Sequence, residues 1–192
     1  MGSTDLGGSP EFAASDNQGH IYNNLEDKNQ VLQIDARTLR ILNRWPLAPG
    51  ENPSGMAIDA VHRRLFIGCR NRTLVVMNAD SGKVVTTIPI GDGVDANRFD
   101  PGTQIVFSSN GDGTLTIIHE DTPNSYSVIT NAPTQRGART MELDSKTHRV
   151  YLVSAQLGPQ PTTPHTPPPM VPGTFELFVF GIRSETQTPP GR

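Results

Sequence analysis

A repeat of 41 to 44 residues constrains the fold of this chain more than any other feature of its sequence. One aspartate recurs in each repeat, with spacings of 43, 41 and 44 residues, at Asp16, Asp59, Asp100 and Asp144. A second marker follows nineteen residues after each of the first three aspartates, at Asp35, Asn78 and His119. Since two independent markers keep the same period, we expect the chain to be built from repeated structural units.

The clearest unit runs from Pro53 to Gly93 and contains four runs rich in β-branched and other strand-forming residues. These runs are Met56–Ile58, Arg64–Cys69, Thr73–Asn78 and Lys83–Ile90. Polar turns separate them, which predicts short strands joined as an antiparallel meander. Helical repeats of similar length are excluded, because no unit carries apolar residues at i, i+3, i+4 and i+7 over three turns.

A four-stranded meander of this size cannot bury both of its faces alone, so it has to pack between copies of itself. A period of about 40 to 45 residues with four strands per unit is typical of a propeller blade. We therefore predict an all-β fold: a β-propeller made of four-stranded antiparallel meander blades, with about four blades in this chain. The predicted blades span residues 13–52, 53–94, 95–138 and 139–182.

Three segments depart from the repeat. Residues 1–12 are rich in Gly and Ser, lack strand character and resemble a cloning-site scar, so we expect an expression leader before a stunted first strand. The proline-dense insert 156–173 is expected to form an extended, polyproline-like loop. This loop serves either as a plain connection or as a lid or docking arm. The tail 183–192 is polar and expected to be disordered, which leaves the last blade without an outer strand.

Charge and hydropathy exclude several classes of partner. The net charge is −3 and there is no basic run, so we expect no binding to nucleic acid. No run of 18 apolar residues occurs, so we expect no membrane span. The one cysteine, Cys69, falls in a predicted inner strand and is expected to be a buried, unreactive thiol.

Several segments resemble the YVTN-repeat β-propeller family, whose pattern is roughly YVTN followed by VSVID..TG.VV.TI.VG. The resemblance is carried by Ile21–Asn24, Val31–Thr38 and Val75–Gly91. The match extends over about residues 15–182, and the chain has YNN, FIG and FSS where the family has YVT. The resemblance implies a bacterial, extracytoplasmic, seven-bladed ring. With four units, this chain is then expected to be the C-terminal part of a longer propeller.

In a propeller blade, the connection to the next blade and the loop between the second and third strands emerge on the same face. We call this the loop face. It is expected to gather the three interblade connections, the loops of the first three units and the proline-rich insert. The connections and loops are residues 47–53, 90–94, 130–138, 26–29, 70–72 and 110–113.

Opposite charges occupy three matched positions of the third and fourth units: Asp92 with Arg136, Asp95 with Arg139, and Arg98 with Glu142. Innermost strands of neighbouring blades run side by side, so we predict a charge-paired seam. The pairs either fix the register between blades, at about 0–1 kcal/mol each, or surround the channel mouth and bind a polar ligand. In the second case the ligand-binding residues are Glu51, Asp92, Asp95, Arg98, Arg136 and Arg139.

No catalytic or metal-binding motif accompanies these residues. The five histidines show no HxH or HxxxH pairing, so they predict no metal site. Glu51, Asp92 and Asp95 offer the oxygen ligands that Ca²⁺ prefers, yet no compact D-x-D-x-D run is present. There is no G-x-S-x-G, and the two GDG sequences are turns with no helix after them. We therefore predict no catalytic residue, no metal and no cofactor.

These observations favour a non-enzymatic platform that binds a small polar ligand or a protein partner at the loop face. Two alternatives stay open: a hydrolytic, lactonase-like propeller enzyme with its site at the channel mouth, and a purely structural module. An arc of four blades leaves two blade faces open. We therefore expect self-association through the first and fourth units, most simply two chains forming an eight-bladed ring, rather than a closed four-bladed ring.

Overall fold

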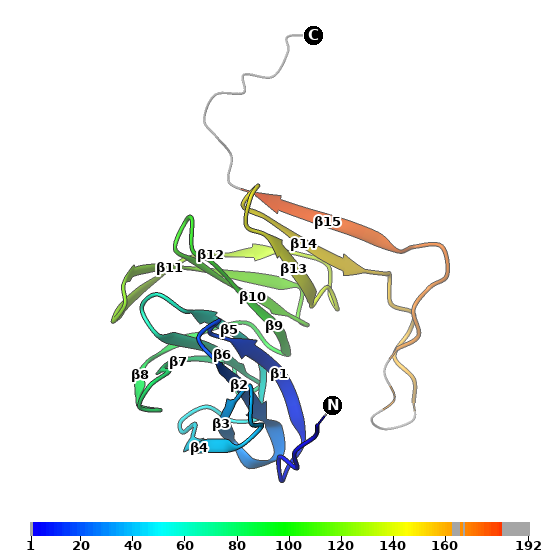
Figure 1. The fold of residues 1–192 in the computed structure, drawn as a ribbon. Coiled ribbons are helices and arrows are strands. Elements are labelled where there is room, and N and C mark those ends of the chain that lie inside the picture. Colours follow the sequence, from blue (N-terminus) through cyan, green and yellow to red (C-terminus); the bar gives the residue numbers. More distant parts are fainter. Residues whose placement is uncertain (1, 163–165, 167, 182–192) are drawn as a thin grey trace.

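The computed structural model describes residues 2–162, 166 and 168–181, which form four separate antiparallel β-sheets. The sheets are arranged as a fan, with β1–β4 at one end and β13–β15 at the other (Figure 1). Neighbouring strands of every sheet are consecutive in the chain, so each sheet is a meander. The all-β fold with about four blades is therefore confirmed. The described residues contain no helix long and apolar enough to cross a membrane.

Blades 1 and 2 are four-stranded. Blade 1 contains β1 (Pro10–Ser15), β2 (His20–Leu25), β3 (Gln30–Asp35) and β4 (Ile41–Pro46), with the short 3-10 helix η1 (Glu26–Lys28) before β3. Blade 2 contains β5 (Pro53–Asp59), β6 (Arg64–Cys69), β7 (Thr73–Asn78) and β8 (Val84–Pro89).

Blade 3 is also four-stranded, and blade 4 has three strands. Blade 3 contains β9 (Val94–Asp100), β10 (Ile105–Asn110), β11 (Thr114–Thr122) and β12 (Ser125–Pro133). Blade 4 contains β13 (Thr140–Asp144), β14 (Arg149–Ser154) and β15 (Glu176–Gly181). As predicted, no outer strand pairs with β15 among the described residues.

The hydrophobic core lies in the layers between the sheets, because the innermost strands β1, β5, β9 and β13 are neighbours. Side chains alternate along each strand, so β6 contributes to two layers at once. Leu65 and Ile67 pack against blade 1, while Phe66 packs against blade 3, with its ring centre 5.2 Å from that of Phe99. Blade 2 is thus apolar on both faces, as a blade with a neighbour on each side requires.

Close approach between blades explains one glycine in particular. Gly82 has a φ of +68°, and a Cβ at this position would overlap the indole ring of Trp45 on blade 1. Only glycine satisfies both constraints, since other residues are strained at this φ. The turn between β7 and β8 can therefore lie directly against the outer strand of blade 1.

The first strand begins earlier than we predicted. β1 starts at Pro10, within the segment 1–12 that we expected to lack strand character. The innermost strand of blade 1 is therefore not stunted. The side-chain amide of Asn23 donates to two backbone carbonyls of this segment, at 3.0 and 3.3 Å. The ring of Phe12 lies beneath the Arg98 guanidinium, 5.5 Å from the ring centre. Tertiary contacts of this kind place the strand, and its own composition does not reveal them.

Residues 2–9 cover the face of blade 1 that has no neighbouring blade. This face carries three buried side chains: Leu25, Leu32 and Ile34. Leu6 packs against them, and its carbonyl accepts a 2.8 Å hydrogen bond from the Arg44 guanidinium. Our expectation that the first blade presents an open face is therefore wrong, because the chain's own N-terminal segment occupies that face.

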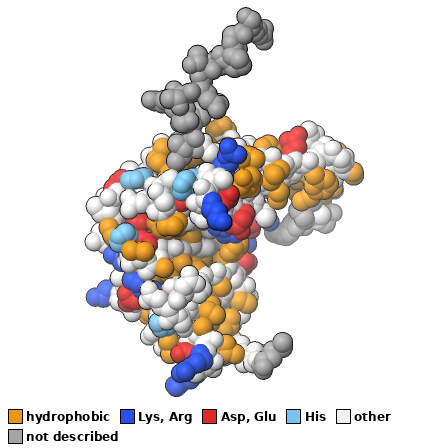
Figure 2. All heavy atoms as spheres, turned by 45° about the horizontal axis from the view of Figure 1, so that its top comes forward, with side chains coloured by type: hydrophobic (Ala, Val, Ile, Leu, Met, Phe, Trp, Pro, Cys, Tyr) orange, Lys and Arg blue, Asp and Glu red, His pale blue; other side chains and the backbone are white. Residues whose placement is uncertain are grey.

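The corresponding face of blade 4 is exposed. Its apolar side chains Val153, Leu177 and Val179 are 49–59% exposed. Val153 pairs with Leu177, and Tyr151 with Val179, so all four point to one side of the sheet. We call this group the blade 4 free face. In Figure 2, which brings this end of the molecule forward, hydrophobic side chains gather there. The other side of the sheet packs on blade 3 through residues such as Leu152.

The proline-rich insert leaves blade 4 between β14 and β15 and is closed at its base by a short neck. The neck consists of a hydrogen bond from Gly158 N to Pro169 O, one from Val171 N to Gln156 O, and a bridge between Leu157 and Met170. The two bonds measure 2.7 and 2.8 Å. We predicted a loop that joins no ladder, and this single bridge is the exception. The predicted tail 183–192 lies outside the described residues.

Candidate functional site

The loops and connections predicted to share one face do so. The backbone N–H of Arg70 donates to the Glu51 carbonyl at 3.0 Å, which ties a blade 2 loop to the connection before it. The N–H of Gly111 donates to the Gly93 carbonyl at 3.0 Å in the same way in blade 3. The Arg70 guanidinium also lies 3.1 Å from the carboxylate of Glu26 in blade 1. The loop face is therefore held together by contacts within and between blades.

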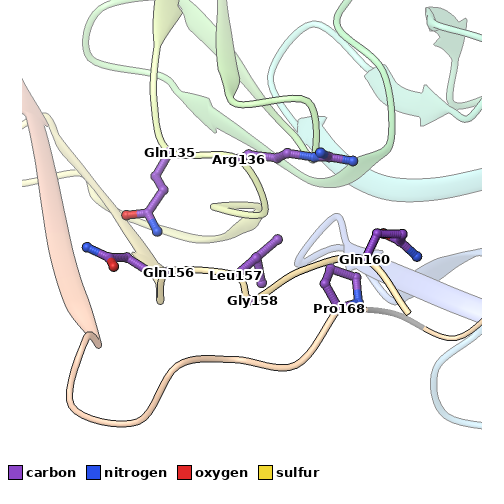
Figure 3. A pocket seen from close by; sticks show the side chains of 7 residues that line it. All are labelled: Gln135, Arg136, Gln156, Leu157, Gly158, Gln160 and Pro168. Atoms are coloured by element: carbon purple, nitrogen blue, oxygen red, sulfur yellow. The ribbon is translucent and has the colours of Figure 1, made fainter. Parts of the chain in front are cut away.

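The connection from blade 3 to blade 4 and the insert enclose a hollow of about 480 Å³ on this face. The residues lining it are Gln135, Arg136, Gln156, Leu157, Gly158, Gln160 and Pro168. Figure 3 shows that Gln135 and Arg136 diverge, so the amide and the guanidinium point to different ends of the hollow. Three glutamine amides offer donors and acceptors, and the hollow therefore suits a polar ligand.

A second hollow of about 490 Å³ shares Arg136 with the first and is lined also by Asp92, Gly93, Gly111 and Asp112. The carboxylate of Asp112 accepts a 2.8 Å hydrogen bond from the backbone N–H of Asp92. Arg136 is exposed and forms no ion pair among the described residues. Its guanidinium therefore stands between one hollow lined by amides and another lined by carboxylates.

Two of the three predicted ion pairs form between blades 3 and 4. The Arg98 guanidinium donates to both carboxylate oxygens of Glu142, at 3.0 and 3.1 Å, and these bonds lower the pKa of Glu142. Arg139 Nε lies 3.9 Å from Asp95 Oδ1, a looser contact. The charge-paired seam between the two innermost strands is thus confirmed at these positions.

The third predicted pair does not form. The carboxylate of Asp92 instead lies 3.3 Å from the guanidinium of Arg72, which belongs to the loop between the second and third strands of blade 2. The connection that carries Arg136 turns at Gly137, whose φ is +85°, and this turn directs Arg136 toward the insert. Alignment of the blades on their aspartates does not account for this turn, so it predicts an ion pair with Asp92 that does not form, although the two residues line the same hollow.

The six predicted ligand-binding residues do not line a single cavity. Asp92 and Arg136 share the 490 Å³ hollow, whereas Asp95 and Arg98 line a separate hollow of about 370 Å³ beside Phe12. Glu51 is exposed and is held through its backbone. A common ligand for all six therefore stays a prediction. Of the six residues, Arg136 lines two adjoining hollows.

The recurring aspartates lie on the opposite face, between the blades. Three of them are buried, and each is hydrogen-bonded to a histidine ring: Asp16 to His20 at 2.8 Å, Asp59 to His62 at 2.5 Å, and Asp100 to His148 at 2.7 Å. The sequence pattern identified the aspartates as a recurrent feature. It did not reveal their bonds to histidine rings.

Asp16 is the centre of a network that joins blades 1 and 2. Burial alone raises the pKa of Asp16, but backbone N–H bonds from His20 and Gln18, the His20 ring and Arg63 together lower it well below its usual range. Arg63 donates to Asp16 at 3.0 Å and to the Tyr22 hydroxyl at 2.8 Å. A residue of blade 2 thereby satisfies buried polar groups of blade 1.

The sequence does not predict one cluster of potential metal ligands. Asp59, His62 and Glu120 bring one potential ligand atom each to within 4.8 Å of the others. Glu120 comes from a different blade, so no local spacing motif connects it to His62. The available signal was its position directly after the second repeat marker, where the other units have Ala36 and Ala79.

The thiol of Cys69 is buried, as predicted. Burial raises its pKa to about 12 and outweighs the opposing hydrogen bond with the Glu51 backbone. The nucleophilic thiolate is therefore scarcely populated at neutral pH, and Cys69 is part of the core between blades 1 and 2.

No family model and no curated protein matches this sequence. Solved structures do share its fold. Hydrazine synthase of Kuenenia stuttgartiensis is similar with a TM-score of 0.70 and 15% identity, over 81% of this chain and 44% of that one. The WD40 repeats of RRP9 are similar with a TM-score of 0.67 and 19% identity, over 79% and 47%. The chain spans less than half the length of either, and it has the β-propeller-like fold that both share.

Proposed function

We propose that this chain is a non-enzymatic interaction module that binds a carboxylate-bearing polar ligand or protein segment at the loop face. The observation that carries the proposal is Arg136, an exposed guanidinium between two adjoining hollows with no ion-pair partner among the described residues. Guanidinium and carboxylate form charge-assisted, frequently bidentate hydrogen bonds. Both hollows fall within the size range of ordinary ligand pockets, about 300–1,000 Å³.

The two hollows differ in charge, which orients such a ligand. Asp92 and Asp112 line the second hollow and repel a carboxylate there. The first hollow presents the amides of Gln135, Gln156 and Gln160, and no carboxylate is among the described residues that line it. The acidic group is therefore expected to lie beneath the insert, with Arg136 as its anchor.

Peptide binding tests this proposal. A panel of labelled peptides of equal length, one acidic, one neutral and one basic, is titrated against the full chain and against Arg136→Ala. We expect the acidic peptide to bind best and to lose at least tenfold in affinity in the variant. Arg149→Ala is the matched control, because Arg149 is an exposed arginine at the start of β14, away from the loop face. Equal loss in both variants, or equal binding of all three peptides, would overturn the proposal.

We also propose that a second copy of the chain covers the blade 4 free face. Support comes from its exposed apolar side chains and from the edge of β15, which has no strand partner among the described residues. Light scattering should give twice the chain mass of 20.8 kDa, and Leu177→Glu should return the protein to one chain. Val61→Glu, at an exposed turn residue outside this face, is the control. A single-chain mass for the unmodified protein defeats this proposal.

Membership of the YVTN-repeat family stays a proposal that rests on the three segments described above. The same holds for a bacterial, extracytoplasmic origin and for the view that the chain is part of a longer propeller. The hydrolytic alternative draws support from no particular contact on the loop face. Turnover in a broad ester and lactone screen, lost on substitution of Arg136, would favour it over the interaction module.

A further inference from the structure

On the face opposite the loop face, two of the three seams between blades pair a buried aspartate with a basic side chain from the following blade. Asp16 lies 3.0 Å from Arg63 of blade 2, and Asp100 lies 2.7 Å from His148 of blade 4. Arg63 and His148 are structurally equivalent. Each is the fourth residue after its own blade's aspartate, and each has a left-handed φ, of 60° and 55°.

The middle seam, between blades 2 and 3, lacks this basic side chain. The equivalent residue is Gln104, which also has a φ of 55° but carries no charge. A carboxylate occurs at the next matched position, because Glu120 takes the place of Ala79. The N–H of Ala79 donates to the Arg63 carbonyl at 3.0 Å, and that of Glu120 donates to the Gln104 carbonyl at 2.8 Å. The middle seam thus lacks the basic side chain of the other two seams and carries a second carboxyl group instead.

The consequence is a compact cluster of Asp59, His62 and Glu120. Asp59 is 3% exposed and Glu120 is 1% exposed. One carboxylate oxygen of Glu120 accepts a hydrogen bond from the Tyr126 hydroxyl at 3.2 Å, while the other, Oε2, has no partner. A buried carboxylate oxygen without a partner is costly, so its occurrence in a residue that clusters with two further ligand atoms requires an explanation.

Neighbouring cations do not provide that explanation. Arg64 is the nearest, but its guanidinium donates to the carbonyls of Pro123 and His62 and to the side chain of Asn124, at 2.7–2.9 Å. It forms no ion pair with Glu120 or with any other carboxylate among the described residues. The buried carboxyl groups of Asp59 and Glu120 therefore lie close together, and the His62 imidazole is the basic group in their cluster.

We propose that Asp59, His62 and Glu120 bind one divalent transition-metal ion, best matched by Zn²⁺, at the seam between blades 2 and 3. An imidazole with two carboxylates is a donor set that suits Zn²⁺, and the dication balances both negative charges. Metal–ligand bonds of about 2.1 Å place ligand atoms up to about 4.2 Å apart, so small side-chain turns close the set from 4.8 Å.

The geometry supplies the other requirements of a metal site. His62 is 39% exposed on its side chain, which gives an ion access from solvent. The Tyr126 hydroxyl donates a hydrogen bond to Oε1 of Glu120 and so fixes the orientation of this carboxylate. The site lies on the face opposite Arg136. A test of Zn²⁺ binding is therefore independent of the test of ligand binding at the loop face.

Titration calorimetry with Zn²⁺ alone, after treatment of the full chain with EDTA, tests the proposal. We expect one ion per chain and a melting temperature that rises with Zn²⁺. Glu120→Gln, which keeps the shape of the side chain, and His62→Ala should each weaken Zn²⁺ binding at least tenfold. Gln104→Arg should also weaken Zn²⁺ binding at least tenfold, because it places at this seam a guanidinium equivalent to that of Arg63 at the seam between blades 1 and 2.

Two histidine controls separate this site from adventitious binding. His148→Ala removes the Asp–His bond at the next seam, and His119→Ala removes a half-exposed histidine paired with Asp121. Both should leave Zn²⁺ affinity unchanged. The proposal is overturned if the unmodified chain binds no Zn²⁺ at millimolar concentration, or if Glu120→Gln binds it as tightly. A Glu120→Gln variant that is as stable as the unmodified chain, with no response to Zn²⁺ in either, would show that a proton suffices instead.

Discussion

The two ends of the blade stack meet solvent in different ways. At the blade 1 end, residues 2–9 lie across the apolar side chains, and Leu32 is fully buried. At the blade 4 end, side chains of the same kind are about half exposed, and Leu177 is 59% exposed. Sheets of this kind need a cover on each face. One end has such a cover within the chain, and the other has none among the described residues.

The turn aspartates repeat this contrast. Asp16 is buried beneath Arg63 of the following blade. Asp144 occupies the same place in blade 4 and is only partly buried, because no further blade follows among the described residues. Asp144 still accepts bonds from the Lys146 N–H and the Thr147 hydroxyl of its own turn. A repeated residue therefore has a local role in every blade and an interblade role only where a neighbour is present.

Truncation of matched leucines should show the contrast most strongly. Leu32→Ala removes a fully buried side chain at the covered end and is expected to lower the free energy of unfolding by about 2–5 kcal/mol. Leu177→Ala, at the uncovered end, should change it by no more than about 0.5 kcal/mol in a single chain. Urea denaturation of both variants measures the difference. Similar losses would mean that the blade 4 free face is covered in solution.

Neutralising the matched aspartates should have the next largest effect. Asp16→Asn weakens bonds to His20 and Arg63 in a buried network, and we expect a loss of about 2–3 kcal/mol. Asp144→Asn weakens only turn bonds and should lose clearly less stability than Asp16→Asn. Chemical denaturation checks both. Equal losses would contradict an interblade role for Asp16.

The pH dependence of stability should follow from the lowered pKa of Asp16. A carboxyl whose pKa is lower in the folded protein than in the unfolded chain contributes its full stabilisation above the unfolded value, near pH 4. That contribution is lost as the pH falls toward the folded pKa, because the unfolded chain takes up the proton first. Urea titrations between pH 2.5 and 6 should show this slope, and it should be shallower in Asp16→Asn. An unchanged slope would assign the acid sensitivity to other carboxyls.

The smallest effect is expected at the ion pair between blades 3 and 4. Glu142 is 70% exposed on its side chain, so its bidentate bond to Arg98 is accessible to water and salt. Glu142→Ala should therefore lower the free energy of unfolding by about 1 kcal/mol or less, and high salt should reduce the difference. Thermal unfolding at two salt concentrations measures it. A larger, salt-insensitive loss would mean that the seam holds the last blade in place.

The sequence predicts the blades well because each blade is a local structure. Strands such as β6 and β7 are short runs of strand-forming residues between polar turns, and their spacing repeats. The order of strands and the loop face then follow from meander topology. The same reasoning misses β1, whose first residues are placed by contacts with Asn23 and not by their own composition.

The candidate site is less accessible to sequence analysis because it depends on contacts between units. Alignment of the repeats correctly pairs Arg98 with Glu142, since both lie on regular innermost strands. It predicts an ion pair between Arg136 and Asp92 that does not form, because the connection before blade 4 turns at Gly137. It also overlooks Glu120, whose partners Asp59 and His62 come from the preceding blade.

The neck of the insert has a practical consequence. Backbone hydrogen bonds between Gly158 and Pro169 and between Gln156 and Val171 close the insert at its base, next to β14 and β15. Changes in the insert beyond this neck should therefore not disturb the sheet of blade 4. Foreign sequence grafted between these two anchor points should be tolerated by the rest of the molecule. The insert is accordingly the natural place for an epitope tag or a fluorescent reporter beside Arg136.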